Sequence, residues 1–162
     1  MLRTIAFVAA AVLGSVTAVS AAGMDQPAQP SVEYGKYISI LGGCNDCHTP
    51  GYNESGGQID PAKALIGSQA GYQGPWGTTY PTNLRLLAST MTEDDWVKFL
   101  STFKARPPMP FYNVNAMNET MKRSLHMYLA SLGALGDPAP DYVKPGDKPK
   151  FPYVVEAPPT MP

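Results

Sequence analysis

One pentapeptide constrains the fold of this chain more than any other stretch: Cys44-Asn45-Asp46-Cys47-His48. Two thiols at this spacing reach the two vinyl groups of a single porphyrin, and the residue that follows places an imidazole under the iron. The pattern C-x-x-C-H is the attachment signature of a c-type haem. We therefore expect one covalently attached haem c, bound through Cys44 and Cys47, with His48 as an iron ligand.

Two other interpretations of the cysteines need weighing, because Cys44 and Cys47 are the only ones in the chain. A Cys-x-x-Cys redox pair is expected within a β-α-β pattern, and no such pattern surrounds the motif. A structural zinc site needs four ligands, and the only other histidine is His126. Haem attachment accounts for the whole motif and leaves no thiol for a structural disulfide.

The N-terminal residues predict export. Arg3 is the lone charge before an uncharged apolar run over residues 5–19, and small residues follow. This run is shorter than the roughly 20 residues that a membrane-spanning helix needs. We expect residues 1–22 to be a signal peptide cleaved near Ala21 or Ala22, with no stable membrane insertion afterwards. The predicted location is the periplasm, which suits a haem that is attached outside the bacterial cytoplasm.

The whole chain has the size and composition of one globular domain. Of its 162 residues 44% are hydrophobic and 15% are charged, and the formal net charge is −1. A charge this small gives no reason to expect a nucleic-acid partner. We predict a flexible lead-in over residues 23–30, a haem domain over 31–136 and an extended, proline-rich tail over 137–162. A buried haem would add apolar surface to a thin core.

Three helices are predicted from capping residues and apolar periodicity. Ser31 begins the first, which is expected to run directly into the haem motif. Its Gly35 has two interpretations, the close approach of another helix or a tolerated weak spot. Thr92 begins the second with a capping box, and Pro107 and Pro108 are expected to end it. Asn118 begins the third, and Gly133 follows its apolar stripe.

Residues 49–91 are rich in glycine and proline and show no sustained period. The pattern predicts a long loop that packs on the porphyrin, with one short helical turn over residues 62–66. Trp76 and Tyr80 each combine apolar area with one donor, which suits a haem propionate. The alternative is that both are ordinary core aromatics. Arg85 has two interpretations, a propionate partner or a solvated surface residue.

The sixth iron ligand is predicted to be Met109. It lies between Pro108 and Pro110, which stiffen the backbone and hold a thioether outward. Methionine with histidine is the usual ligand pair of an electron-carrying c haem. Met117, also predicted to lie in a loop, is the main competitor, and a ligand role for His126 is a further alternative.

Together these residues resemble the cytochrome c family of the small, single-haem, helical type, over about residues 33–135. A narrower similarity is to the haem domains of cytochrome subunits that serve membrane-bound alcohol and gluconate dehydrogenases, although those subunits usually carry several such domains and this chain has one. The resemblance implies an all-α, cytochrome c-like fold of about 3–5 helices around the haem, with the first and last helices crossing near Gly35. The motifs that carry it are Gly35-Lys36-Tyr37, Cys44-x-x-Cys47-His48, Gly74-Pro75-Trp76-Gly77, Tyr80-Pro81-Thr82-Asn83-Leu84, Asp94-Asp95-Trp96, Met109-Pro110-Phe111 and Tyr128-Leu129-Ala130-Ser131-Leu132.

The function predicted from these observations is that of a periplasmic, monohaem c-type cytochrome. It would carry single electrons between redox proteins, a donor dehydrogenase and a terminal acceptor, and would not itself be an enzyme. One alternative is an electron-transfer subunit of a larger oxidoreductase, docked through the tail. Another is a haem enzyme or gas-binding protein with a labile sixth site.

Overall fold

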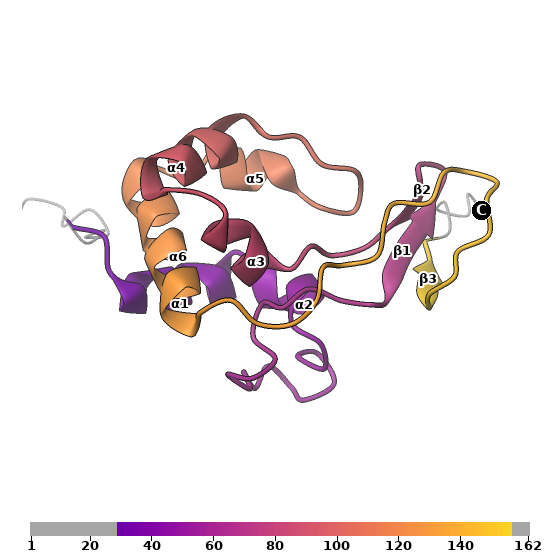
Figure 1. The fold of residues 1–162 in the computed structure, drawn as a ribbon, viewed down its shortest axis with the longest axis horizontal. Helices are drawn as coiled ribbons and strands as arrows, with labels where there is room; N and C mark the ends of the chain where they lie inside the picture. The colour runs from indigo at the N-terminus through magenta and orange to yellow at the C-terminus, as the bar shows by residue number, and fades with distance from the viewer. Residues whose placement is uncertain (1–28, 157–162) are drawn as a thin grey trace, which may run out of the picture.

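The computed structural model describes residues 29–156, and in this part 39% of the residues are helical. The predicted signal peptide, most of the lead-in and the end of the tail lie outside the described residues. The helices and strands are α1 (Val32–Leu41), α2 (Cys44–His48), β1 (Gly71–Gly74), β2 (Gly77–Thr79), α3 (Leu84–Ser89), α4 (Glu93–Thr102), α5 (Phe111–Asn115), α6 (Glu119–Leu132) and β3 (Tyr153–Val155). Figure 1 shows the helices gathered at one end of the molecule and the small sheet at the other.

Helices α1 and α6 cross in close contact, as Gly35 predicted. Ser31 caps α1 by accepting a hydrogen bond from the Tyr34 amide at 3.1 Å. Its own amide donates to Ser124 Oγ of α6 at 3.2 Å. A Cβ added at Gly35 would overlap the backbone carbonyl oxygen of Ser124. The glycine is therefore required by the close packing of the two backbones.

The first helix does not run directly into the haem motif, contrary to the sequence prediction. It ends at Leu41, and the Gly42 amide returns to the Ile38 carbonyl at 2.8 Å. Gly43 then adopts a left-handed conformation with φ of +66°, which breaks the helical path before Cys44 begins α2. The motif consequently forms a short helix of its own.

The other two predicted helices begin at their expected caps. The Thr92 hydroxyl accepts from the Asp95 amide at 3.2 Å, and the Asn118 side chain accepts from the Met121 amide at 2.9 Å. Gly133 follows α6 with a positive φ of +69°, as predicted. Helix α4, however, ends at Thr102, because Phe103 is already extended (φ −61°, ψ 154°); Pro107 and Pro108 do not end it.

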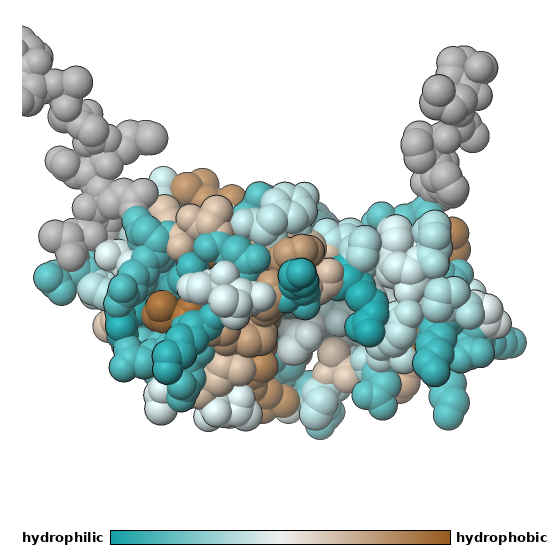
Figure 2. All heavy atoms as spheres, turned by 90° about the horizontal axis from the view of Figure 1, so that it is seen from above, coloured by the Kyte–Doolittle hydropathy of each residue, from teal (hydrophilic) through white to brown (hydrophobic). Residues whose placement is uncertain are grey.

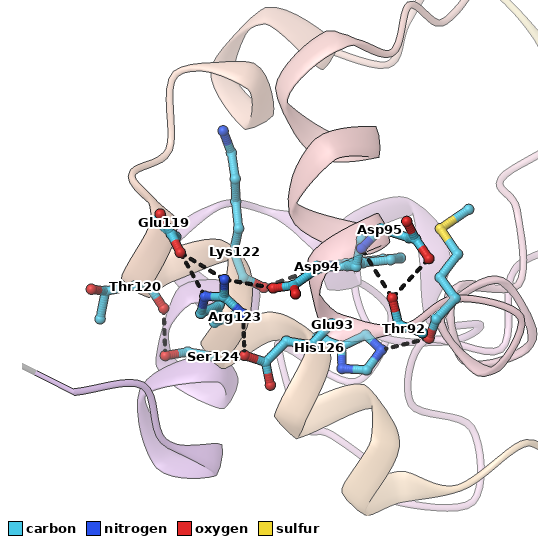
Figure 3. Close-up of polar contacts among 12 residues, drawn as sticks. Thr92, Glu93, Asp94, Asp95, Glu119, Thr120, Lys122, Arg123, Ser124 and His126 are labelled. Carbon is cyan, nitrogen blue, oxygen red and sulfur yellow. Dashed lines mark hydrogen bonds and ion pairs between the residues drawn. The ribbon is translucent and has the colours of Figure 1, made fainter.

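One arginine ties the start of α4 to the start of α6. Arg123 forms ion pairs with Glu93 at 2.6 Å, with Asp94 at 2.7 Å and with Glu119 at 2.7 Å (Figure 3). These three hydrogen-bonded carboxylates raise the pKa of the guanidinium. The network fixes two helix N-termini against each other on the side of the molecule away from the sheet (Figure 1).

The segment from residue 49 to residue 91 is more ordered than its sequence predicted. It contains the antiparallel pair β1 and β2, in which Tyr72 is opposite Thr79 and Gly74 is opposite Gly77. It also contains α3, capped by the Asn83 side chain. A turn over residues 61–65 takes the place of the predicted helical turn. These elements are too short for an apolar period to reveal them.

The tail folds back onto the domain and completes the sheet. Strand β3 pairs in parallel with β1, with Gly71 opposite Tyr153, so the strand order is β2-β1-β3. Val143 pairs with Thr78 in an isolated antiparallel bridge. Asn83 Nδ2 also donates to the backbone carbonyl oxygens of Leu135 at 2.8 Å and Asp137 at 3.2 Å. The all-α prediction does not include this sheet.

The hydrophobic core has a small, fully buried centre and a larger, half-buried margin. The buried members are Ile38, Leu65, Ala88, Trp96, Leu100, Leu125, Tyr128 and Leu129. Half-buried side chains packed against them include Cys44 and Met117. Figure 2 shows hydrophobic residues in the middle of the face it presents, between more hydrophilic ends. Within residues 29–156, no helix is both long and apolar enough to cross a membrane.

Candidate functional site

Helix α2 gathers Cys44, Cys47 and His48 within one short turn, and the buried side chain of Asn45 anchors that turn. Asn45 Nδ2 donates to the Ser39 carbonyl oxygen of α1 at 3.2 Å. Its Oδ1 accepts a hydrogen bond from the Thr49 hydroxyl at 2.8 Å. The sequence analysis gave Asn45 no role, because the residues between two attachment cysteines carry no signal of their own. The structure makes it the support of the motif.

One ring nitrogen of His48 makes a hydrogen bond, and the other makes none among the described residues. The imidazole is only 8% exposed, and its Nδ1 lies 2.7 Å from the Thr82 carbonyl oxygen. A carbonyl oxygen only accepts, so Nδ1 carries the proton and Nε2 keeps its lone pair. Burial lowers the pKa of this histidine, although the Thr82 contact opposes the shift. A neutral imidazole oriented by a carbonyl is the arrangement typical of a histidine that binds a metal.

Thr82 contributes through its backbone, which explains why the sequence analysis missed it as a partner of His48. Its stretch, Tyr80 to Leu84, was selected for aromatic and polar side chains instead. Any residue type that keeps this backbone conformation would supply the same carbonyl oxygen. No sequence signal identifies it.

Both cysteines are free thiols. Burial raises the pKa of Cys44 to about 11, and the thiol therefore stays protonated at neutral pH. The Tyr72 hydroxyl of β1 donates to Cys47 Sγ at 3.4 Å. Burial, then this hydrogen bond, raises the pKa of Tyr72. The hairpin thus reaches the motif through Tyr72, a contact that the sequence did not predict.

Met117 lies next to the motif. A Cβ added at Gly42 would be 3.4 Å from Met117 Cε and 3.7 Å from Cys44 Sγ, so both side chains border the same point. Met117 and Cys44 also pack against the buried core. The structure therefore gives Met117 a packing role beside the first cysteine.

Met109 lies in the connection between α4 and α5. This connection extends from the two helices toward the sheet, apart from α2 (Figure 1). Met109 is half-buried, and its backbone accepts from the Phe111 amide at 2.9 Å. Among the described residues it does not belong to the hydrophobic side chains packed against the core. Met109 and Met117 thus lie in different surroundings.

His126 makes its contacts on the far side of α6 from the crossing with α1. Its Nε2 lies 3.2 Å from the Met91 carbonyl oxygen, and its ring centroid is 5.9 Å from that of Trp96. A cavity of about 300 Å³ adjoins it, between α3 and α6. Through these contacts His126 links α6 to the start of α4.

One of the two interpretations of Arg85, that of a solvated surface residue, is wrong; a contact with a propionate stays a prediction. Arg85 is 5% exposed, so it is not a solvated surface residue. Its guanidinium donates to the carbonyl oxygens of Leu132, of Gly133 at 2.5 Å and of Pro61 at 3.2 Å. Two of these belong to the end of α6, where a cation also favours the helix dipole. Arg85 is therefore a buried helix cap, with its donors used by the polypeptide.

The two aromatic residues of the hairpin region differ in how their polar atoms are used. The Tyr80 hydroxyl donates to the Phe151 carbonyl oxygen at 3.5 Å. The indole N–H of Trp76 is buried and has no hydrogen-bond partner among the described residues. A buried donor without an acceptor is costly, so this N–H is open to an acceptor that the described residues do not provide.

The side chains of residues 29–156 include no group of three or more His, Cys, Asp or Glu that would hold a metal ion by themselves. A cavity of about 480 Å³ lies at the sheet, lined by Gln73, Gly74, Asp147 and Glu156 among others. Neither it nor the cavity beside His126 borders the Cys44–His48 turn.

Comparison of the chain with protein-family models, with curated proteins and with solved structures finds no match in any of the three.

Proposed function

We propose that this protein is a periplasmic, monohaem c-type cytochrome that carries single electrons between redox proteins. One observation carries the proposal: His48 has its Nδ1 bound to the Thr82 carbonyl and its Nε2 free, one turn from two free thiols. The C-x-x-C-H sequence asks for two thiols and an iron-binding imidazole in this order. The resemblance to the cytochrome c family supports the same reading.

The residues fit a haem in three respects. Cys44 and Cys47 are unpaired and available for two thioether bonds. The neutral His48 has the protonation state of a metal ligand, and its anchored Nδ1 fixes the ring orientation. The half-buried margin of the core leaves apolar side chains, Met117 among them, that a flat apolar group would cover. When bound, the haem supplies a one-electron iron couple.

We propose Met109 as the sixth ligand, as the sequence predicted. Two observations support this choice over Met117. Met117 already fills a position in the core margin, whereas Met109 has no such packing role among the described residues. Pro108 and Pro110 limit the backbone freedom of Met109, which lowers the entropy lost on binding iron.

An electron carrier is favoured over a haem enzyme because the chain offers few groups for proton chemistry near the motif. His126 is the only other histidine, and it is engaged with Met91 and Trp96. With His48 and Met109 both holding it, a bound haem iron would supply one-electron chemistry and would leave no position open to a substrate. Its partners would be a donor dehydrogenase and a terminal acceptor, met in small, transient encounters.

The alternative of an electron-transfer subunit rested on the tail as a docking element. The described tail residues instead pair with their own domain through Val143 and β3. The side chains of β3 are nevertheless exposed, Val155 by 66%. Co-purification with an endogenous membrane dehydrogenase from detergent extracts would favour the subunit; recovery as a free protein would favour the carrier.

The ligand assignment is tested with Met109→Ala and the matched variant Met117→Ala in the haem-loaded protein. Met109→Ala is expected to abolish the iron–sulfur charge-transfer band of the oxidised protein and to let the reduced protein bind carbon monoxide. Met117→Ala is expected to keep the band. The reverse pattern would assign Met117. Covalently attached haem in the double variant Cys44→Ser/Cys47→Ser would refute the attachment itself.

A further inference from the structure

We propose that Tyr142, in the C-terminal tail, is a positioning residue for Met109. It acts through Arg106 to hold the segment of residues 106–110 in place, and it thereby slows replacement of the methionine on the haem iron. This inference rests on the proposed function, because it takes Met109 as the sixth ligand.

The segment 106–110 has little backbone anchorage of its own. Three of its five residues are prolines, which have no N–H and cannot join a helix or a strand ladder as donors. The Met109 amide bonds within the segment, to the Arg106 carbonyl oxygen at 3.2 Å. The Met109 and Pro110 carbonyl oxygens accept from the Phe111 amide at 2.9 Å and the Asn113 amide at 3.0 Å, which ties the end of the segment to α5. Side-chain contacts from other elements hold its first residues.

Two such contacts come from the sheet end of the molecule. The Thr79 hydroxyl of β2 donates to the Pro107 carbonyl oxygen at 2.9 Å. The guanidinium carbon of Arg106 lies 3.7 Å above the centre of the Tyr142 ring. This distance is well inside the range of a cation–π interaction. Arg106 is exposed, so the ring is the feature that orients it.

Tyr142 is itself rigidly placed. Its hydroxyl donates to the Trp76 carbonyl oxygen at 2.7 Å. The next residue, Val143, exchanges two backbone hydrogen bonds with Thr78, at 2.8 and 3.0 Å. Gly77 has a φ of +96°, and a Cβ there would overlap the Val143 carbonyl oxygen. The glycine lets the tail lie flat against the hairpin, which gives Arg106 a fixed platform.

These contacts, which we call the clasp, link the β1–β2 hairpin through Tyr142 to Arg106, three residues before Met109. A ligand that leaves iron rebinds at a rate set by its local concentration, and a tethered segment keeps that concentration high. Loosening the tether lets an external ligand compete. The clasp affects the rate at which the ligand is replaced. It does not change which residue is the ligand, which remains Met109.

The test is the rate at which imidazole replaces methionine in the oxidised, haem-loaded, full-length protein, followed by loss of the charge-transfer band. Arg106→Ala and Tyr142→Ala are each expected to speed replacement about tenfold, the factor that corresponds to losing about 1.4 kcal/mol. Tyr142→Phe keeps the ring and loses the bond to Trp76, so its effect should be about threefold. The double variant should be no faster than the faster single variant, because both changes break one contact.

Tyr153→Ala is the matched control, a tail tyrosine in β3 that pairs with Gly71 and is expected to exchange at the wild-type rate. Additive effects in the double variant, or wild-type rates for Arg106→Ala and Tyr142→Ala while Met109→Ala abolishes the band, would overturn the clasp alone. A band that survives Met109→Ala would overturn the proposed ligand and the clasp with it. Should Tyr142→Ala fail to accumulate, exposed Arg106→Ala with Tyr142→Phe carries the same comparison.

Discussion

The crossing of α1 with α6 and the turn from Cys44 to His48 differ in how far the chain completes them. At the crossing, the backbones touch at Gly35, and Ser124 Oγ accepts from Ser31. At the turn, neither cysteine is in a disulfide, Cys47 Sγ accepts one hydrogen bond from Tyr72, and among the described residues the His48 Nε2 has no hydrogen-bond partner. The first region is finished by its own side chains. The second presents the groups that a bound prosthetic group would use.

The largest expected effect comes from closing the space at the crossing. Gly35→Ala should lower the free energy of unfolding by about 3 kcal/mol, because its Cβ would push against backbone, which cannot rotate away. Urea unfolding followed by far-UV circular dichroism measures this. Gly51→Ala is the control, since its Cβ would meet nothing within 4 Å and only its positive φ costs energy, about 1 kcal/mol. Equal losses in the two variants would show that the crossing is looser than described.

A smaller effect is expected at Arg85, for which the sequence left two interpretations open. Arg85→Met should cost about 2 kcal/mol, because three carbonyl oxygens lose a buried donor. The reduction potential of the haem should stay unchanged, since the guanidinium is used by α6 and the loop at Pro61. Urea unfolding and a redox titration on the same variant separate the two roles. A shifted potential with unchanged stability would return Arg85 to the haem site.

The smallest effect distinguishes the two tryptophans. Trp96 Nε1 donates to the Lys122 carbonyl oxygen at 3.1 Å, whereas the N–H of Trp76 has no acceptor in the described chain. Trp96→Phe should therefore cost about 1 kcal/mol more than Trp76→Phe in urea unfolding of the haem-loaded protein. Equal costs would mean that a bound group accepts from Trp76, as the sequence predicted for a propionate.

The sequence predicted the long helices well because each has a capping side chain and an apolar stripe. Ser31, Thr92 and Asn118 all cap the helices assigned to them. It failed at features set by backbone geometry or by distant pairing. The end of α4 at Thr102, the break at Gly43 and the three-stranded sheet leave no periodic pattern in short segments.

The candidate site divides in the same way. Cys44, Cys47 and His48 were predicted because their spacing is itself the chemical signal, and α2 holds them in one turn. The supporting contacts come from the Thr82 carbonyl and the Tyr72 hydroxyl, and the types of these two residues do not predict such contacts. Met109 stays a prediction with Met117 as its rival, since the choice depends on a group outside the polypeptide.

The pairing of β3 with β1 also has a bearing on when the protein can fold. Gly71 meets Tyr153 across 82 positions of the chain, so the central strand gains its second neighbour only after residue 153 has been synthesised. Pairings this distant close large loops and slow folding. A ribosome-bound chain that ends before residue 150 would already contain Cys44 to His48 and α6, yet β1 would have an open edge. The turn from Cys44 to His48 and the crossing of α1 with α6 would thus be able to form before the sheet is complete.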